Sequence, residues 1–187
     1  MNLLIIDLFD SFTYNLMHIC KKYIHNIDVI RVNQVNIEQL AKYKKIIISP
    51  GPGIPSDYPI LFDVLKEYDT SKSILGICLG FQVIGSYYGG TLYNLNQVMH
   101  GKKSLIKQTS LVDCIYKNVP NNFFVGRYHS WGVSLENEKK LIVTSRNLKG
   151  SIMSFRHRIN NVVGIQYHPE SILTKYGDLI VKNWLNN

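Results

Sequence analysis

The sequence predicts an α/β fold with a mainly parallel sheet, helices on both faces, and antiparallel strands added at one edge. Short apolar runs alternate with stretches of helical periodicity over residues 3–88 and return near residue 162. This alternation is typical of strand–helix–strand units in a parallel sheet. Residues 91–145 instead contain shorter runs rich in β-forming residues, which favour antiparallel strands at an edge.

The individual elements follow in order. Residues 3–6 are an unbroken apolar run, as in a strand buried on both faces, and Ser11 is the expected N-cap of the next helix. Further along we expect a strand at 27–32, a short helix at 37–43, a strand at 46–49, a stiff proline–glycine loop at 50–55, a helix at 59–68, a strand at 74–77, a helix at 81–88 and a strand at 162–166. The closing helix is expected to pack through Ile172, Leu173, Tyr176, Leu179, Ile180 and Trp184.

The composition limits the class of protein. A length of 187 residues with 45% hydrophobic types fits one domain over residues 1–187. No apolar run approaches the roughly 20 residues that cross a bilayer, and the N-terminal stretch lacks the features of a signal peptide. We therefore expect a cytoplasmic protein without membrane contact. The net charge of +8 comes from dispersed lysine pairs, so we expect a solvated surface or an acidic partner and no nucleic-acid binding.

Cys78 differs from the other two cysteines in its surroundings. It lies between Gly76 and Gly80, where an apolar strand is followed by a helix. A nucleophile at such a sharp turn has a strained backbone and leaves no room for flanking side chains. The helix N-terminus favours the thiolate and offers N–H groups to an oxyanion. Cys20 and Cys114 are expected to be packing residues, and without a C-x-x-C pair we expect no metal site.

His168 and Glu170 follow the last buried strand. Residues two apart in an extended chain point to one side, so Glu170 can hold the imidazole. The carboxyl ends of parallel strands meet at one sheet edge, where Cys78 also lies. His168 would then transfer protons for Cys78. The alternative is a strand end followed by an acidic first helical turn. The remaining histidines are expected to be surface or satisfied polar residues: His18, His25, His100, His129 and His157.

Six segments in order along the chain resemble the class I glutamine amidotransferases, and among them component II of anthranilate synthase and of aminodeoxychorismate synthase. They are D-S-F-T-Y-N-L at 10–16, S-P-G-P-G-I-P at 49–55, G-I-C-L-G-F-Q at 76–82, H-G-K at 100–102, R-Y-H-S at 127–130 and Y-H-P-E-S-I-L at 167–173. The resemblance implies a flavodoxin-like amidotransferase domain. It also implies a hetero-oligomer in which this chain makes ammonia from L-glutamine for a larger chorismate-binding synthase subunit. That partner would bind Mg²⁺, and this chain would carry no cofactor.

The resemblance also assigns roles to individual positions. Cys78 would be the nucleophile, completed by His168 and Glu170, and the N–H groups of Gly53 and Leu79 would form the oxyanion hole. The glutamine site would be lined by Gly51, Pro52, Gly53, Leu79, Gln82, Ser130 and Trp131. Two positions depart from the family pattern, because Leu8 stands where Asn is usual and Trp131 where Leu is frequent. They bear on the partner contacts and on the branch of the family.

Other functions stay open from the sequence. The product could be aminodeoxychorismate for folate synthesis instead of anthranilate for tryptophan, or one subunit could serve both, since chorismate binds elsewhere. A hypothesis of another class is a catalytically silent binding or regulatory subunit with the same fold. The cysteine turn by itself also permits a cysteine protease or an esterase-like hydrolase.

Overall fold

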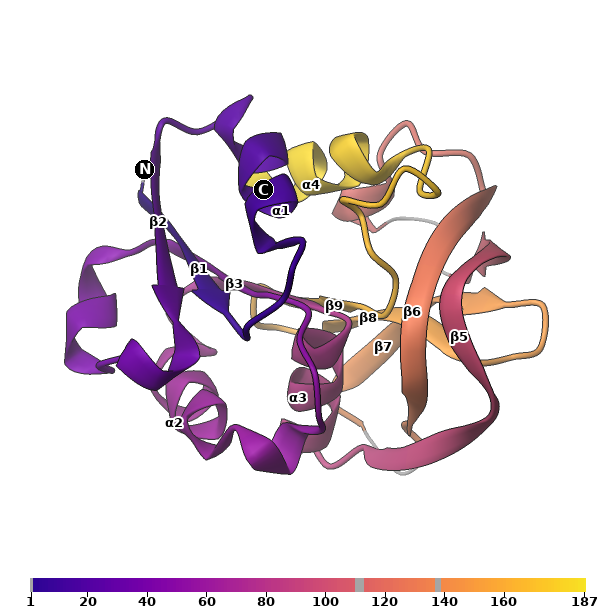
Figure 1. Cartoon of the computed structure of the whole chain (residues 1–187), viewed down its shortest axis with the longest axis horizontal. Coiled ribbons are helices and arrows are strands. Elements are labelled where there is room, and N and C mark those ends of the chain that lie inside the picture. The colour runs from indigo at the N-terminus through magenta and orange to yellow at the C-terminus, as the bar shows by residue number, and fades with distance from the viewer. Residues whose placement is uncertain (1, 110–112, 137–138) are drawn as a thin grey trace.

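A computed structural model of the chain describes residues 2–109, 113–136 and 139–187. One nine-stranded sheet runs through them in the order β2-β1-β3-β4-β9-β8-β7-β5-β6 (Figure 1). The parallel half consists of β1 (Asn2–Asp7), β2 (Asn26–Arg31), β3 (Lys45–Ile48), β4 (Ser73–Ile77) and β9 (Val162–Ile165). The antiparallel half consists of β5 (Thr91–Gln108), β6 (Asn122–Ser134), β7 (Leu141–Asn147) and β8 (Ile152–His157).

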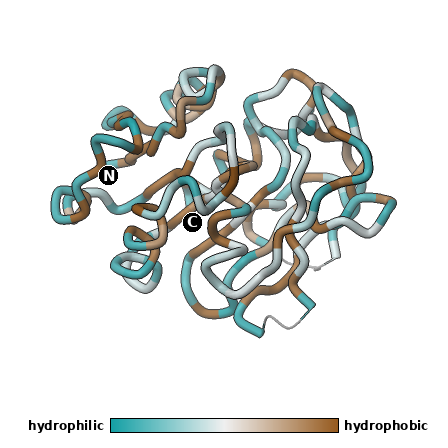
Figure 2. The backbone as a smooth tube through the Cα atoms, turned by 60° about the horizontal axis from the view of Figure 1, so that its bottom comes forward, coloured by the Kyte–Doolittle hydropathy of each residue, from teal (hydrophilic) through white to brown (hydrophobic). Residues whose placement is uncertain are grey.

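Four helices cover the two faces of the parallel half. On one face α1 (Thr13–Lys21) and α4 (Gly177–Leu185) pack on a core that includes Leu3 and Ile5. On the other face α2 (Pro59–Tyr68) and α3 (Leu79–Tyr87) pack on a core that includes Leu4 and Ile6. Successive strand residues point to opposite faces, so an entirely apolar strand serves both cores. Figure 2 shows the hydrophobic stretches running through the centre and the hydrophilic ones around the outer loops.

Several predicted elements need correction. Ser11 does not cap α1: the helix starts after Phe12, and no side chain makes a cap hydrogen bond to it. The carboxylate of Asp10 instead accepts the amide of Phe12, and that of Asp7 accepts the hydroxyl of Thr13. The element expected at 37–43 is a 3-10 helix, Glu38–Lys42. The middle of the chain holds long strands of 18 and 13 residues, β5 and β6, where shorter runs were expected.

The closing helix also begins later than expected. Ile172, Leu173 and Tyr176 precede α4, and Ile172 is 97% exposed instead of facing the core. The chain between β9 and α4 is held as a loop, because the hydroxyl of Thr174 donates to the carbonyl of His168. None of the described helices has both the length and the apolar character required to traverse a bilayer.

Candidate active site

Cys78 lies at the sharp turn between β4 and α3. Its φ is 53° and its ψ is −100°, a conformation that costs a non-glycine residue of order 1–3 kcal/mol. The neighbouring glycines are required by contact. A Cβ on Gly76 would lie 2.4 Å from the carbonyl oxygen of Gly80, and a Cβ on Gly80 would lie 2.4 Å from that of Ile48. The predicted steric reason for both glycines is therefore confirmed.

His168 and Glu170 form a buried pair beside this turn. His168 Nδ1 lies 2.5 Å from Glu170 Oε1, and the two side chains are 6% and 2% exposed. A loop contact holds the pair against β6, because the His168 amide donates to the carbonyl of Gly126. In the described part of the chain, His168 Nε2 makes no hydrogen bond to a nitrogen or oxygen atom.

The electrostatics favour the charged form of His168. Burial by itself lowers the pKa of His168, but the nearby sulfur of Cys78 and then the Glu170 carboxylate raise the pKa well above its ordinary value. The sulfur and the carboxylate thus act on one imidazole.

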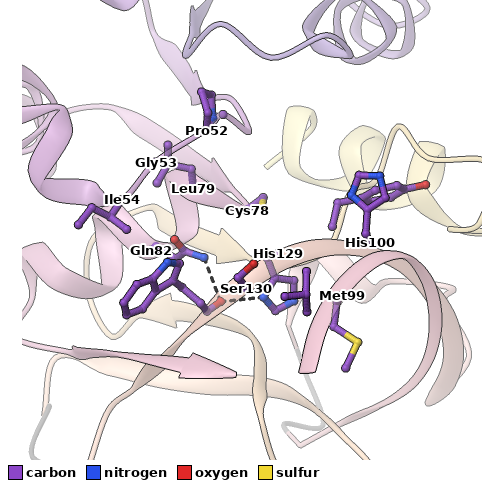
Figure 3. A pocket seen from close by; sticks show the side chains of 14 residues that line it. Pro52, Gly53, Ile54, Cys78, Leu79, Gln82, Met99, His100, His129 and Ser130 are labelled. Carbon is purple, nitrogen blue, oxygen red and sulfur yellow. Dashed lines mark hydrogen bonds between the residues drawn. The ribbon is translucent and has the colours of Figure 1, made fainter. Parts of the chain in front are cut away.

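A cavity of about 320 Å³ opens beside Cys78 (Figure 3). Its lining includes all seven residues that the resemblance assigned to glutamine, namely Gly51, Pro52, Gly53, Leu79, Gln82, Ser130 and Trp131. His168 and Glu170 lie outside this lining. They border a second hollow of about 220 Å³, and Tyr128 lines both spaces. The described residues contain no cluster of His, Cys, Asp or Glu suited to a metal ion.

One wall of the cavity is the loop between β3 and α2. Gly53 has φ +81°, and a Cβ there would lie 2.3 Å from the Asp57 carboxylate, which accepts the amide of Ile54. Gly51 is equally confined, because its Cβ would lie 2.5 Å from that of Leu8. Leu8, which stands where the family usually has Asn, is therefore buried and packs against this loop. The loop presents bare backbone to the cavity at fixed positions.

The opposite wall is β6, where a chain of hydrogen bonds reaches the cavity. Arg127 Nε donates to His129 Nε2 at 3.0 Å. Because arginine can only donate, Nε2 accepts and the ring proton is on Nδ1. Nδ1 then donates to the Trp131 carbonyl at 2.7 Å, and Gln82 Nε2 donates to the same oxygen at 3.1 Å (Figure 3). The Trp131 backbone is therefore held from two sides.

His129 is neutral in this arrangement. Burial, followed by the charge of Arg127, lowers the pKa of His129 to about 3. Its expected status as a satisfied polar residue is correct, but the sequence did not place it in the cavity lining. The R-Y-H-S segment was the available signal, because Tyr128, His129 and Ser130 of that segment all line the cavity.

Comparisons with known proteins point to one family. A family model described as glutamine amidotransferase class-I matches residues 4–187. An anthranilate synthase component 2 of Pyropia yezoensis is 40% identical, with 98% of each chain covered. One of Pseudomonas aeruginosa is 37% identical, over 98% of this chain and 94% of that protein. A solved structure of a glutamine amidotransferase from Thermotoga maritima has a TM-score of 0.73 and is 16% identical in sequence. The match covers 100% of this chain and 81% of that one. That likeness confirms the predicted fold class.

Proposed function

Because the chain belongs to the class I glutamine amidotransferase family, we propose that it hydrolyses L-glutamine at Cys78 and supplies ammonia to a chorismate-binding synthase subunit that makes anthranilate. The observation that carries the proposal is the meeting of Cys78 with the buried His168–Glu170 pair beside the cavity. The names of the relatives from Pyropia and Pseudomonas favour anthranilate as the product. Aminodeoxychorismate, or a subunit shared by both synthases, is the alternative.

The first half of the reaction makes ammonia. The Cys78 thiolate attacks the side-chain amide carbon of glutamine, and the carbonyl electrons move to the oxygen. The N–H groups of Gly53 and Leu79 stabilise that oxyanion. As the carbon–nitrogen bond breaks, the imidazolium of His168 donates its proton to the departing ammonia. The product is a γ-glutamyl thioester on Cys78.

The second half restores the enzyme. Neutral His168 takes a proton from water, and the resulting hydroxide attacks the thioester carbon. The carbon–sulfur bond breaks to give a thiolate, the new γ-carboxyl group releases its proton to solvent as glutamate leaves, and His168 is again the imidazolium. Glu170 stabilises the charged ring through Nδ1 in both halves and keeps Nε2 towards the reacting atoms.

The proposed assembly is a hetero-oligomer. We assign no cofactor to this chain and place Mg²⁺ on the synthase subunit with chorismate. The net charge of +8 suits an acidic docking surface on that partner. We expect weak glutaminase activity from the isolated chain and activation by the synthase, since a displaced oxyanion donor costs about 10²–10³ in rate.

Labelling with a glutamine-analogue electrophile tests the chemistry. With the synthase present, we expect one covalent adduct at Cys78, none in Cys78→Ala, and an unchanged adduct in Cys114→Ala, which is the matched control. An unlabelled native chain would favour the silent binding subunit. Turnover of peptides or esters without turnover of glutamine would establish a different hydrolase.

The product is tested separately. The chain is mixed with each candidate synthase, glutamine and chorismate, and the aromatic product is identified by chromatography. Anthranilate is expected, with glutamate released in equal amount. Formation of aminodeoxychorismate alone would assign the chain to the other branch, and equal glutaminase rates with and without a synthase would contradict activation.

A further inference from the structure

Arg127 is a buried cation without a carboxylate partner in the described ranges. The residue is only 2% exposed, and within the described ranges its side chain makes one hydrogen bond, from Nε to His129. The ion pairs found between described residues lie elsewhere, at Lys22–Asp178, Lys42–Asp28 and His168–Glu170. Burying a guanidinium without a counter-charge is unfavourable, so this position invites an anion.

Arg127 lines a cavity of about 350 Å³ that is distinct from the one beside Cys78. The two cavities share Met99 in their linings, and this second cavity lies among the first part of β5, β6 and the turn between β7 and β8. Among the residues that the structure describes, no aspartate or glutamate lines it. Besides Arg127, its polar lining consists of Tyr93, Asn94, Asn96, Gln97, Asn147, Lys149 and Ser151.

Two of these residues are arranged as donors. The side-chain oxygen of Asn147 already accepts the backbone amides of Lys149 and Ser151, at 3.0 and 2.9 Å. The NH₂ group of Asn147 is therefore the end that is left for a ligand. Lys149 adds a second positive charge, and its side chain makes no ion pair with any described residue.

We propose that this cavity binds a small oxyanion, a carboxylate or a phosphate, with Arg127 as the main ligand and Lys149 and Asn147 as further donors. The free edge of the guanidinium matches either oxyanion with two parallel hydrogen bonds. The bound anion would supply the negative charge that Arg127 does not find among the described residues. This site does not depend on the chemistry proposed at Cys78.

Calorimetric titration of the full chain tests the site, with inorganic phosphate in one arm and succinate in the other, at ionic strength held constant with sodium chloride. Saturable one-site binding of at least one of the two anions is expected, and the arm that binds identifies the oxyanion. Lys149→Gln should weaken binding about tenfold, and Arg127→Gln about a hundredfold. Lys66→Gln, an exposed position on α2, removes the same charge elsewhere and should leave binding unchanged.

Three results would overturn the proposal. The first is the lack of saturable binding of both anions to the native chain. The second is equal binding by Lys149→Gln and the native chain, which decides the matter even if Arg127→Gln does not fold. The third is an equal loss of binding in Lys66→Gln, because binding would then follow net charge instead of the cavity. Glutamine turnover enters none of these readouts, so failure of the proposed activity leaves the test intact.

Discussion

The two walls of the cavity beside Cys78 are built by different forces. The wall that carries Cys78 is fixed by backbone contacts behind it, where Gly76, Gly80 and the Ile48 carbonyl meet with no room for a methyl group. The wall on β6 is fixed by polar contacts, from Arg127 through His129 to the Trp131 carbonyl. Steric contacts tolerate almost no displacement, whereas hydrogen bonds can lengthen or be replaced by water.

The strand pairing shows the same difference. Along the parallel half the registers are continuous, while the β5–β6 ribbon shifts register between Asn94 and Met99 and again between His100 and Lys102. The proposed nucleophile is on the rigid wall, and part of the proposed substrate site is on the irregular one. We infer that the rigid wall sets the rate of chemistry and the ribbon mainly sets affinity.

The largest expected effect comes from adding one methyl group to the rigid wall. In Gly80→Ala the new Cβ would lie 2.4 Å from the Ile48 carbonyl oxygen, so backbone must move. We expect a loss of about 3 kcal/mol in the free energy of unfolding and at least about 10²-fold in glutaminase rate. Urea unfolding and glutamate release measure the two.

Gly150→Ala is the matched control for this change. Gly150 also has a positive φ, +84°, but a Cβ there would meet no atom within 4 Å. It should cost only about 1–2 kcal/mol from its backbone conformation and leave the rate unchanged. Equal losses in the two variants would mean that the cysteine turn is no tighter than an open loop.

The parallel half could be predicted from the sequence because its patterns are local. The helix expected at 59–68 is α2, Pro59–Tyr68, and the strand expected at 74–77 lies within β4. Strands buried on both faces appear as apolar runs, and the glycines around Cys78 mark a turn that any such strand would need. The same local signals marked Cys78 as the candidate nucleophile, whereas the glutamine-site residues on this side came from the resemblance to the family.

The ribbon could not be predicted in the same detail. Most residues of β5 are exposed or half-buried, so no alternation marks the strand, and its length depends on pairing with β6. The role of His129 depends on the burial of Arg127, which is a tertiary property. Ile172 was misplaced for a related reason, because an apolar residue at helical spacing gave no sign that the chain there is a loop.

The next largest effect tests the charge on the rigid wall. Glu170→Gln keeps the shape of the side chain but removes one of the two groups that raise the pKa of His168. We expect kcat to fall about 10²-fold. Because the imidazolium must donate a proton to ammonia, activity is lost as pH rises through the pKa of His168, and this alkaline limb should move to lower pH in the variant.

The pH profile of glutamate release separates this effect from a structural one. Asp10→Asn removes another carboxylate that interacts with the same histidine but is not among the groups that raise its pKa, so the limb should stay near its native position. If the limb of Glu170→Gln stays in place while kcat falls, Glu170 acts through position alone and its charge is not needed.

On the ribbon a smaller effect is expected. His129→Ala leaves Arg127 Nε without its acceptor and the Trp131 carbonyl with one donor fewer. We expect a loss of about 1–3 kcal/mol in stability and a rise of about tenfold in KM for glutamine, with kcat little changed. His18→Ala, exposed on α1, is the control. A fall in kcat at constant KM would show that the ribbon sets the chemistry as well.

The last prediction concerns the pH dependence of stability, to which His129 and His168 contribute with opposite signs. The pKa of His129 is about 3 in the folded chain against 6.5 for the free side chain, so below pH 6.5 the unfolded chain binds one more proton there. Stability therefore falls on acidification, by at most about 1.4 kcal/mol per pH unit, and recovers fully above pH 6.5.

His168 has the opposite sign, because its raised pKa contributes stability that is lost as pH rises. Urea unfolding of the native chain and His129→Ala between pH 4 and pH 7 isolates the first term, since His168 is common to both. The native curve should fall more steeply below pH 6.5. Parallel curves would mean that His129 takes up a proton without breaking its contact with Arg127, which would make the polar wall far more adaptable than its hydrogen bonds suggest.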